Sequence, residues 1–283
     1  MSSILTNNSA MTALSTLRNI NTNLASTQNK ISTGLSISSG KDNAAYFSIS
    51  KTMSGDSGMY KAIDENLTLQ QNAVSTARLG SETLVELANE FVERVAFAQG
   101  GTDEVRADVQ AELDELVARM KTTISQSTFN GTDYVSSTAS AGTDVTVVTG
   151  ISRTASGVTT TSMTFKTQSL GMIADALDAL DLTASASADA AGQAAVLQAA
   201  EKQLSNAIAS ATSLGIAEKS IETQKEFLTS LSDRLDSGVG AMVDADMEEE
   251  AARLQALQVQ QQLATQSLSI ANSSPQNILS LFR

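Results

Sequence analysis

The sequence predicts a mainly α protein: a coiled-coil bundle of long helices with paired terminal helices and a small β-hairpin insert. Apolar residues keep a heptad spacing through much of the chain, and residues 132–168 are instead rich in Thr, Ser, Val and Gly. The two ends are almost uncharged. Residues 254–282 contain no charged side chain, and residues 1–40 contain only Arg18 and Lys30. Gln, Ser and Asn fill the gaps between apolar residues in the C-terminal stretch, and lipid would leave those amides unsatisfied, so we expect the ends to pack against protein.

Composition excludes several classes of function. The chain has 283 residues, a formal charge of -13 and a pI of about 4.4, so nucleic acid is not an expected partner. It contains no His and no Cys, so the chain cannot have a thiol nucleophile, a metal site with imidazole or thiolate ligands, or a Ser-His catalytic pair. We therefore expect no enzyme activity, no cofactor and no bound metal. The first residues have no basic start or continuous apolar run, so a secretory signal peptide is not expected.

The first segment, residues 1–40, is expected to be a helix followed by a loop. Apolar residues recur three, four and seven positions apart, which places them on one helical face. They are Leu17, Ile20, Leu24 and Ile31. Gly34 and the Ser-rich run that ends at Gly40 interrupt the pattern and predict the loop.

The second segment, residues 41–131, carries the strongest helical signal. A seam of alternating three- and four-residue steps continues for about five heptads, which is typical of a coiled coil. The seam contains Ile63, Leu67, Gln70, Val74, Ala77, Ser81, Leu84, Ala88, Phe91, Val95 and Ala98. Gly100-Gly101 is expected to end this helix, and Thr102 to cap the next with Asp103 and Glu104 in its first turn. The inward positions of this next helix are Val109, Leu113, Leu116 and Met120, and Asn130-Gly131 is expected to end it.

The insert, residues 132–168, is expected to form two strands. Residues 144–149 and 158–165 are rich in Thr and Val, and Ser156-Gly157 suits the turn between them. An apolar helix is expected from about Ser169, with Leu170, Ile173, Leu177 and Leu180 on one face. Residues 183–192 predict a loop or a kink.

The C-terminal half predicts two more helices, within residues 169–240 and 241–283. The first is expected from about Ala190 to Leu235, and Gly238 and Gly240 are expected to break it. Its two predicted seams contain Leu197, Leu204, Ile208 and Ala211, and then Ile221, Leu228, Leu231 and Leu235. The final helix is expected to begin at a cap formed by Asp244 or Asp246, and Pro275 is expected to end or bend it. Its heptad positions are Val243, Met247, Leu254, Leu257, Ala264 and Leu268.

Two groups of acidic residues are candidates for a metal site or an acid–base pair. Residues 244–250 lack the Gly and the ligand spacing of a calcium loop, and helix capping accounts for their carboxylates. The carboxylates between residues 103 and 115 lie on a helix with a clear apolar stripe, which predicts a solvated face. We therefore expect the function to lie in association. Because a single helix of about 30 residues is marginal in water, we expect the two ends to be disordered or frayed in the monomer and to fold on polymerisation.

Three motifs resemble the bacterial flagellin family. Residues 31–45, with Gly34, Gly40 and Asn43-Ala44-Ala45, are similar to its N-terminal loop and following helix. Residues 127–131 are similar to its helix-to-β turn, and residues 274–283 to its C-terminus. The resemblance covers about residues 1–135 and 170–283. It implies a helical filament that serves motility, with the paired terminal helices inside and the central bundle outside.

The resemblance also implies partners and residue roles. Expected partners are further copies of the chain or other flagellins, an export chaperone, a filament cap and hook–filament junction proteins, with no nucleic acid and no membrane. A type III apparatus would export the unfolded chain, so the protein is expected to be secreted into the extracellular filament. The expected filament-core residues are Leu17, Ile20, Leu24, Ile31, Met247, Leu254, Leu257, Leu268, Ile278 and Leu281. The expected bundle seam is Ile63, Leu67, Val74, Leu84, Phe91, Val95, Leu116, Leu204, Leu228 and Leu235.

The sequence departs from the family pattern in three places. The middle of the chain is short, Ser36 stands where an Arg is usual, and the segment read by the innate immune receptor lacks its Arg anchors. That segment contains Phe91, Glu93 and Val95, and we expect weak receptor activation. Two other interpretations stay open: a hook–filament junction protein, and a cytoplasmic coiled-coil adaptor.

Overall fold

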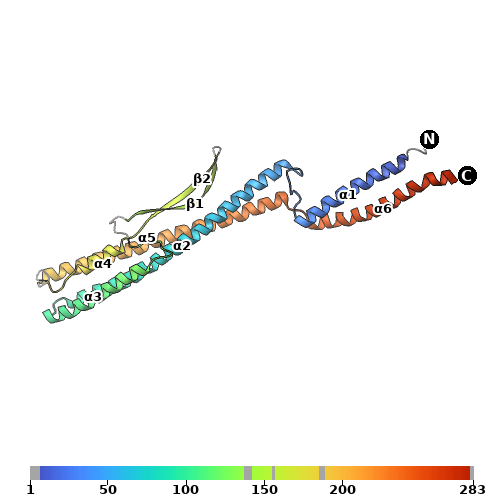
Figure 1. The fold of residues 1–283 in the computed structure, drawn as a ribbon. Helices are drawn as coiled ribbons and strands as arrows, with labels where there is room; N and C mark the ends of the chain where they lie inside the picture. The colour runs from blue at the N-terminus through green and yellow to red at the C-terminus, as the bar shows by residue number, and fades with distance from the viewer. Residues whose placement is uncertain (1–6, 137–141, 155–156, 185–188, 281–283) are drawn as a thin grey trace. The chain divides into compact units, whose positions relative to one another are not determined.

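A computed structural model describes residues 7–136, 142–154, 157–184 and 189–280, with side chains to residue 273 (Figure 1). It contains the helices α1 (Asn8–Thr33), α2 (Ala44–Ala98), α3 (Asp103–Gln126), α4 (Leu170–Asp178), α5 (Ala190–Val243) and α6 (Met247–Ser280). Strands β1 (Asp144–Thr154) and β2 (Gly157–Lys166) form one antiparallel ribbon. The mainly α fold with a small β insert is therefore confirmed.

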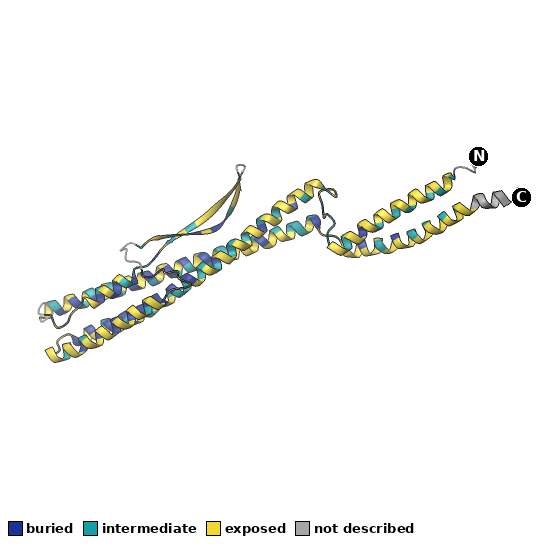
Figure 2. Cartoon of the chain, in the orientation of Figure 1, coloured by how far each residue is buried: buried dark blue, intermediate teal, exposed yellow. Residues whose placement is uncertain are grey.

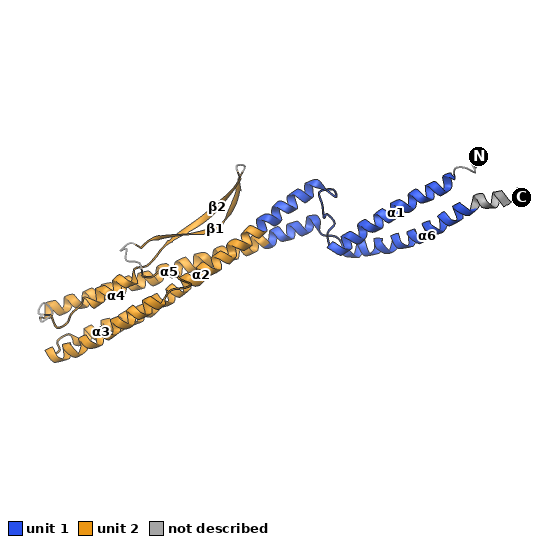
Figure 3. Cartoon of the chain, in the orientation of Figure 1, with its two compact units in different colours: residues 1–57, 233–283 blue, residues 58–232 orange. Residues whose placement is uncertain are grey.

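The chain divides into two compact units (Figure 3). Unit 1 contains residues 1–57 and 233–283, and unit 2 contains residues 58–232. Helices α2 and α5 contribute residues to both units. The sequence-based boundaries near residues 40 and 240 were placed at glycines instead; Gly40 lies in the loop before α2, whereas Gly240 lies inside α5.

Unit 2 holds the main hydrophobic core (Figure 2). The predicted α2 seam lies inside it: Leu67, Val74, Leu84, Phe91 and Val95 are all fully buried. Helix α3 adds Val109, Leu113, Leu116 and Met120, and α4 adds Leu170, Ile173 and Leu177. This heptad pattern explains the length of α2, because one apolar stripe keeps facing its partners along the helix.

Most of the predicted helix ends agree with the structure. Gly34 follows α1 with a φ of 72°, and Gly100 follows α2 with a φ of 74°, both in the left-handed region that favours glycine. Thr102 caps α3, and its side chain accepts a hydrogen bond from the Val105 N–H at 3.4 Å. Asn130 and Gly131 both have positive φ and form the predicted turn between Phe129 and Thr132, which are paired.

Two predicted helix ends were wrong, and of the two alternatives predicted at Pro275, an end or a bend of the helix, the structure removes the end. Helix α3 ends at Gln126, four residues before Asn130. Helix α5 continues through Gly238 and Gly240 to Val243, because glycine only weakens a helix that other contacts hold. Helix α6 continues through Pro275 to Ser280, so this proline does not end it.

The β ribbon is attached to α2 and α5 by polar contacts. The Gln224 side chain of α5 donates to the Thr149 carbonyl at 2.7 Å, and the Tyr60 hydroxyl of α2 donates to the Ile151 carbonyl at 3.2 Å. These contacts lie beside the irregularity in strand pairing between Val148 and Gly150. Both predicted strands are confirmed, although Ser156 of the predicted turn lies outside the described residues.

We predict that Gly80→Ala destabilises the bundle. A Cβ at Gly80 would lie 1.9 Å from the Ser127 Oγ, where α2 passes the end of α3. We expect a loss of about 1–3 kcal/mol in the free energy of unfolding, as for other overpacked cores, measured by urea denaturation. The matched control is Gly58→Ala in the same helix, where nothing lies within 4 Å. Gly58→Ala is expected to add about 0.5–1 kcal/mol through helix propensity, and equal effects of the two changes would contradict the close contact.

Candidate assembly surfaces

The two connections that lead into the terminal helices are hydrogen-bonded to each other. Leu35 and Asp244 form an isolated antiparallel bridge, and the Ser36 N–H donates to the Val243 carbonyl at 2.7 Å. The Ala245 N–H donates to the Gly34 carbonyl at 2.9 Å. The residue that replaces the usual Arg, Ser36, therefore uses its backbone in this junction. The junction fixes where α1 ends and where α6 begins.

The loop after this junction is closed by one carboxylate. Asp42 Oδ2 accepts hydrogen bonds from the backbone N–H groups of Ser38 and Ser39, at 3.1 and 2.9 Å, and from both of their hydroxyls. The backbone hydrogen bond from Ser39 is the largest cause of the lowered pKa of this carboxyl, followed by the one from Ser38. Every contact of Asp42 is local, so we read it as a residue that closes the loop.

Helices α1 and α6 form an antiparallel hairpin (Figure 1). Three polar contacts fix its direction. The Asn7 side chain donates to the Ala271 carbonyl at 2.8 Å, and Gln261 donates to Asn21 at 2.7 Å. Lys30 pairs with Glu250 at 3.2 Å near the junction. From the first contact to the third, the residue number increases along α1 and decreases along α6, as an antiparallel pair requires.

The hairpin buries its seam only in part (Figure 2). The predicted seam residues of α1, Leu17, Ile20, Leu24 and Ile31, are each only half-buried, as are Leu254 and Leu268 on α6. Among the described side chains of the two helices, residues 8–33 and 247–273, only Thr27, Glu250 and Leu257 are buried. The predicted core residue Met247 is 45% exposed, and the Ile278 side chain and Leu281 lie outside the described residues. Two helices alone therefore leave most of this seam partly open.

Helix α6 also carries a second apolar stripe, on the face opposite α1. Val259, Leu263 and Ile270 are 55%, 60% and 65% exposed. They occupy the outer positions of the heptad whose inner positions are Leu254, Leu257, Gln261, Ala264 and Leu268. One partner helix cannot cover both faces of α6. Exposed apolar surface of this kind is typical of a protein–protein contact.

A charged pair joins the two helices of the hairpin close to the junction. The Glu250 side chain is 8% exposed, and the Lys30 side chain is 28% exposed. The Oε1 atom of Glu250 accepts from Lys30, and Arg253 lies 3.6 Å from the same atom. The Oε2 atom is buried without a hydrogen-bond partner among the described residues. A buried charge with so few partners tolerates little change in register, because sliding the helices would separate Glu250 from Lys30, the partner that donates a hydrogen bond to it from the other helix.

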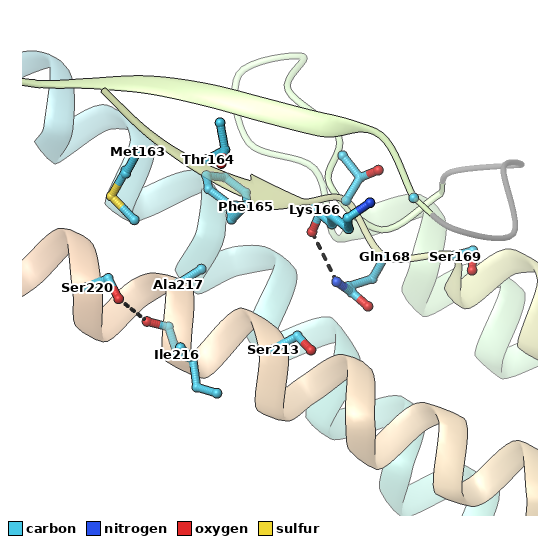
Figure 4. A pocket seen from close by; sticks show the side chains of 12 residues that line it. Met163, Thr164, Phe165, Lys166, Gln168, Ser169, Ser213, Ile216, Ala217 and Ser220 are labelled. Carbon is cyan, nitrogen blue, oxygen red and sulfur yellow. Dashed lines mark hydrogen bonds between the residues drawn. The ribbon is translucent and has the colours of Figure 1, made fainter. Parts of the chain in front are cut away.

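Unit 2 carries a groove of about 460 Å³ between β2 and α5 (Figure 4). Its apolar lining comes from Met163 and Phe165 on the ribbon and from Ile216 and Ala217 on the helix. The ring of Phe165 packs edge-on against Tyr134, with ring centres 5.3 Å apart. Lys166 is the charged residue of the lining, and it pairs with Asp144 at 3.5 Å. This lining has the character of a packing surface, since it offers no pair of groups for acid–base chemistry.

The described residues hold no group of three or more Asp, Glu, His or Cys side chains that could bind a metal ion. The acidic run after α5 acts as predicted for a helix start: Asp246 accepts from the N–H groups of Glu248 and Glu249 at 3.0 and 3.2 Å. Among the described helices, none combines the length and the apolar character needed to span a membrane.

Comparison with known proteins decides the family. The family model described as the bacterial flagellin N-terminal helical region matches residues 4–140, and the C-terminal helical region matches residues 197–282. The chain is 40% identical to Flagellin of Brucella melitensis biotype 1 over the whole of both chains. It is 33% identical to Flagellin FljM of Caulobacter vibrioides over 100% of this chain and 99% of that one.

The chain belongs to the bacterial flagellin family.

It is a structural subunit of the bacterial flagellar filament, and the resemblance found in the sequence is confirmed. A putative flagellar hook-associated protein from Vibrio parahaemolyticus has a similar fold, with a TM-score of 0.51 and 13% identity over 72% of this chain and 98% of that one. That likeness concerns the fold alone. The interpretation as a cytoplasmic adaptor is set aside by the family match.

The predicted seam residues of this flagellin mostly meet in unit 2. Leu116 and Leu228 are buried with the α2 seam, whereas Ile63, Leu204 and Leu235 are half-buried. Ile208 was misplaced, because it is 48% exposed. Sequence reasoning missed the small residues of the true α5 seam, such as Ala200, Ala207, Ser210 and Ala217. Extending the heptad phase of Ile221 towards the N-terminus would have found them.

The segment that resembles the immune-receptor motif is divided between core and surface. Phe91 and Val95 are fully buried in the bundle, and Glu93 is exposed. Arg94 is held by Glu112 at 3.2 Å. Phe91 and Val95 are therefore not available to a receptor in this fold. Weak receptor activation stays a prediction.

We predict that Lys30→Met lowers the temperature at which filaments dissociate. The change removes the hydrogen bond that Lys30 donates to the buried Glu250 carboxylate and leaves only the more distant Arg253, 3.6 Å away. Removing one partner of a buried polar pair costs about 1–3 kcal/mol per subunit. Filament melting is followed by light scattering. The double variant K30M/E250L is expected to recover the loss, because an apolar pair of similar volume needs no partner charge.

Lys219→Met is the matched control, because its pair with Glu222 is exposed and lies in α5, away from Glu250. Its effect should be small. A loss as large in Lys219→Met as in Lys30→Met would argue against a special role for the Lys30–Glu250 pair.

Proposed function

We propose that this flagellin polymerises by folding its two ends: α1 and α6 are largely unfolded in the free subunit and become ordered when neighbouring copies cover them. The observation that carries the proposal is the half-buried seam of the hairpin, together with the exposed second stripe Val259, Leu263 and Ile270. The two helices can cover each other only in part, and assembly supplies the missing contacts.

The energetics favour this order of events. Isolated helices are marginal in water because the first turn is costly to form and each later residue adds little. Full burial of a Leu or Ile side chain contributes about 1.5–3 kcal/mol. In the hairpin most of these side chains gain only part of that amount. Further copies of the chain would cover the same side chains fully, and the gain would offset the entropy lost when both ends become ordered.

The neutral ends also suit passage in an unfolded state. Residues 254–282 carry no charge and therefore have no ion pairs to break, and the partly buried seam of the hairpin has little tertiary structure to unfold. We propose that the subunit leaves the cell unfolded through a flagellar type III apparatus, with an export chaperone covering the ends beforehand. At the growing tip a filament cap would hold new subunits while the ends fold, and junction proteins would join the filament to the hook. Motility is the process that the filament would serve.

Limited proteolysis of the purified full chain tests this proposal. We expect early cleavage within α1 and α6 and a resistant fragment close to residues 44–243, because the bundle keeps its own core. The full chain should elongate short filament seeds, and the purified fragment should not. Ends that resist the protease as long as the bundle, or a fragment that elongates seeds normally, would contradict the proposal.

Seeded growth also separates the filament subunit from a hook–filament junction protein. A filament subunit adds repeatedly, so filament length should rise with time and with subunit concentration. A junction protein would cap the seed after a short layer. Electron micrographs of seeds taken at intervals give the lengths directly.

A further inference from the structure

A second charge-free stretch lies in the middle of α5. Residues 203–217 are 15 consecutive residues without Asp, Glu, Lys or Arg, the longest such run in α2, α3, α4 or α5. One side of this stretch enters the bundle core through Ala207, Leu214 and Ala217. The other side faces outward and is the neutral face of the bundle. It consists of Ser205, Ile208, Ala209, Thr212, Ser213 and Ile216, all exposed.

The neutral face contrasts with the outer face of α3 in the same unit. The α3 face exposes a series of charged side chains, as expected for a surface in water. They are Asp108, Glu112, Asp114, Glu115, Arg119 and Lys121. The neutral face exposes two isoleucines in their place: Ile208 is 48% exposed and Ile216 is 64% exposed. A helix in permanent contact with water has no reason to lose its charges and keep large aliphatic side chains outside.

The neutral face continues into the groove beside the ribbon (Figure 4). Ser213 and Ile216 belong to both, and Met163 and Phe165 form the opposite wall. Together they make one surface of apolar and hydroxyl side chains with a concave part, uncharged apart from Lys166, which is already paired with Asp144. Concave apolar surface with a few hydroxyl groups is well suited to receive side chains of another protein.

The occupant is identified by charge. The subunit has a net charge of -13, so two copies repel each other over most of their surface. Contact is least costly where neither a like charge nor the desolvation of an ion opposes it. The neutral face meets that condition, and it repeats the uncharged composition of the terminal helices. A repeating contact between two different patches on identical chains generates an open helical polymer.

We propose that the neutral face and its groove are the surface of the bundle on which a second copy of this flagellin packs in the filament, while the charged α3 face meets solvent. The proposal rests on the self-assembly described above and assigns it a specific surface outside the terminal helices.

Two threonines provide a matched test. Thr212 lies on the neutral face and Thr122 on α3. Both are exposed, and each hydroxyl donates to the carbonyl four residues earlier, at 2.8 Å to Ile208 and 2.9 Å to Ala118. The chain has no Cys, so Thr212→Cys and Thr122→Cys each create a single thiol. The rate of maleimide labelling is measured for each variant in the monomer and in seeded filaments.

The two thiols should react at similar rates in the monomer. In filaments the thiol at position 212 should react at least about tenfold more slowly, because an interface excludes water and reagent, and the thiol at 122 should keep most of its rate. The inference is overturned if labelling at 212 is as fast in filaments as in monomers, or if both positions slow down equally.

Glutamate variants give an independent readout. Thr212→Glu places a charge on the neutral face and should slow elongation from seeds several-fold, whereas Thr122→Glu should leave elongation unchanged. Equal elongation of the two variants would overturn the inference. If wild-type subunits do not elongate seeds at all, the proposed function fails instead, so the two failures are distinguishable.

Discussion

The structure depends on one geometric constraint: two helices can cover only one face of each other. Helix α6 is apolar on the face towards α1 and again on the opposite face, where Val259, Leu263 and Ile270 lie. From residue 254 to residue 273 its described side chains carry no charge that would favour contact with water over contact with protein. A free hairpin therefore keeps apolar surface in solvent whichever way it packs. Only contacts with further protein remove that surface, and in this family the available protein is the next subunit.

The rest of the chain is arranged around that constraint. The bundle of unit 2 has a complete core of its own, with Leu67, Leu84 and Phe91 fully buried. In the proposed mechanism this unit remains folded before assembly, whereas the ends become ordered on assembly. The buried pair Lys30–Glu250 lies where the hairpin begins, and it ties the register of the two ends to the junction. Charged side chains are concentrated on the exposed face of α3 and are missing from residues 203–217 and 254–282, the surfaces on which we propose that neighbouring copies pack.

The sequence was sufficient to predict most of this arrangement because heptad periodicity reports directly on which face is buried. The α2 seam, the Thr102 cap and the Asn130-Gly131 turn all follow from local chemistry. The errors have physical causes as well. Gly238 and Gly240 did not break α5, and Pro275 did not end α6, since local propensity is weak against a long helical context. The N-terminal half of the α5 seam was misplaced at Ile208, because the small residues that are buried there give a faint periodic signal. The assembly surfaces were predictable at the ends, where charge is absent for a long run. The groove beside the ribbon was not, because it arises from the packing of β2 on α5.

Amide hydrogen exchange of the whole chain, as monomer and as filament, tests the central claim most directly. The backbone amides of α1 and α6 should exchange in the monomer at nearly unprotected rates, while those of α2 around Leu84 are strongly protected. In the filament both sets should be protected. Strong protection of α1 and α6 in the monomer, equal to that of α2, would show that the hairpin is stable alone and would contradict the account.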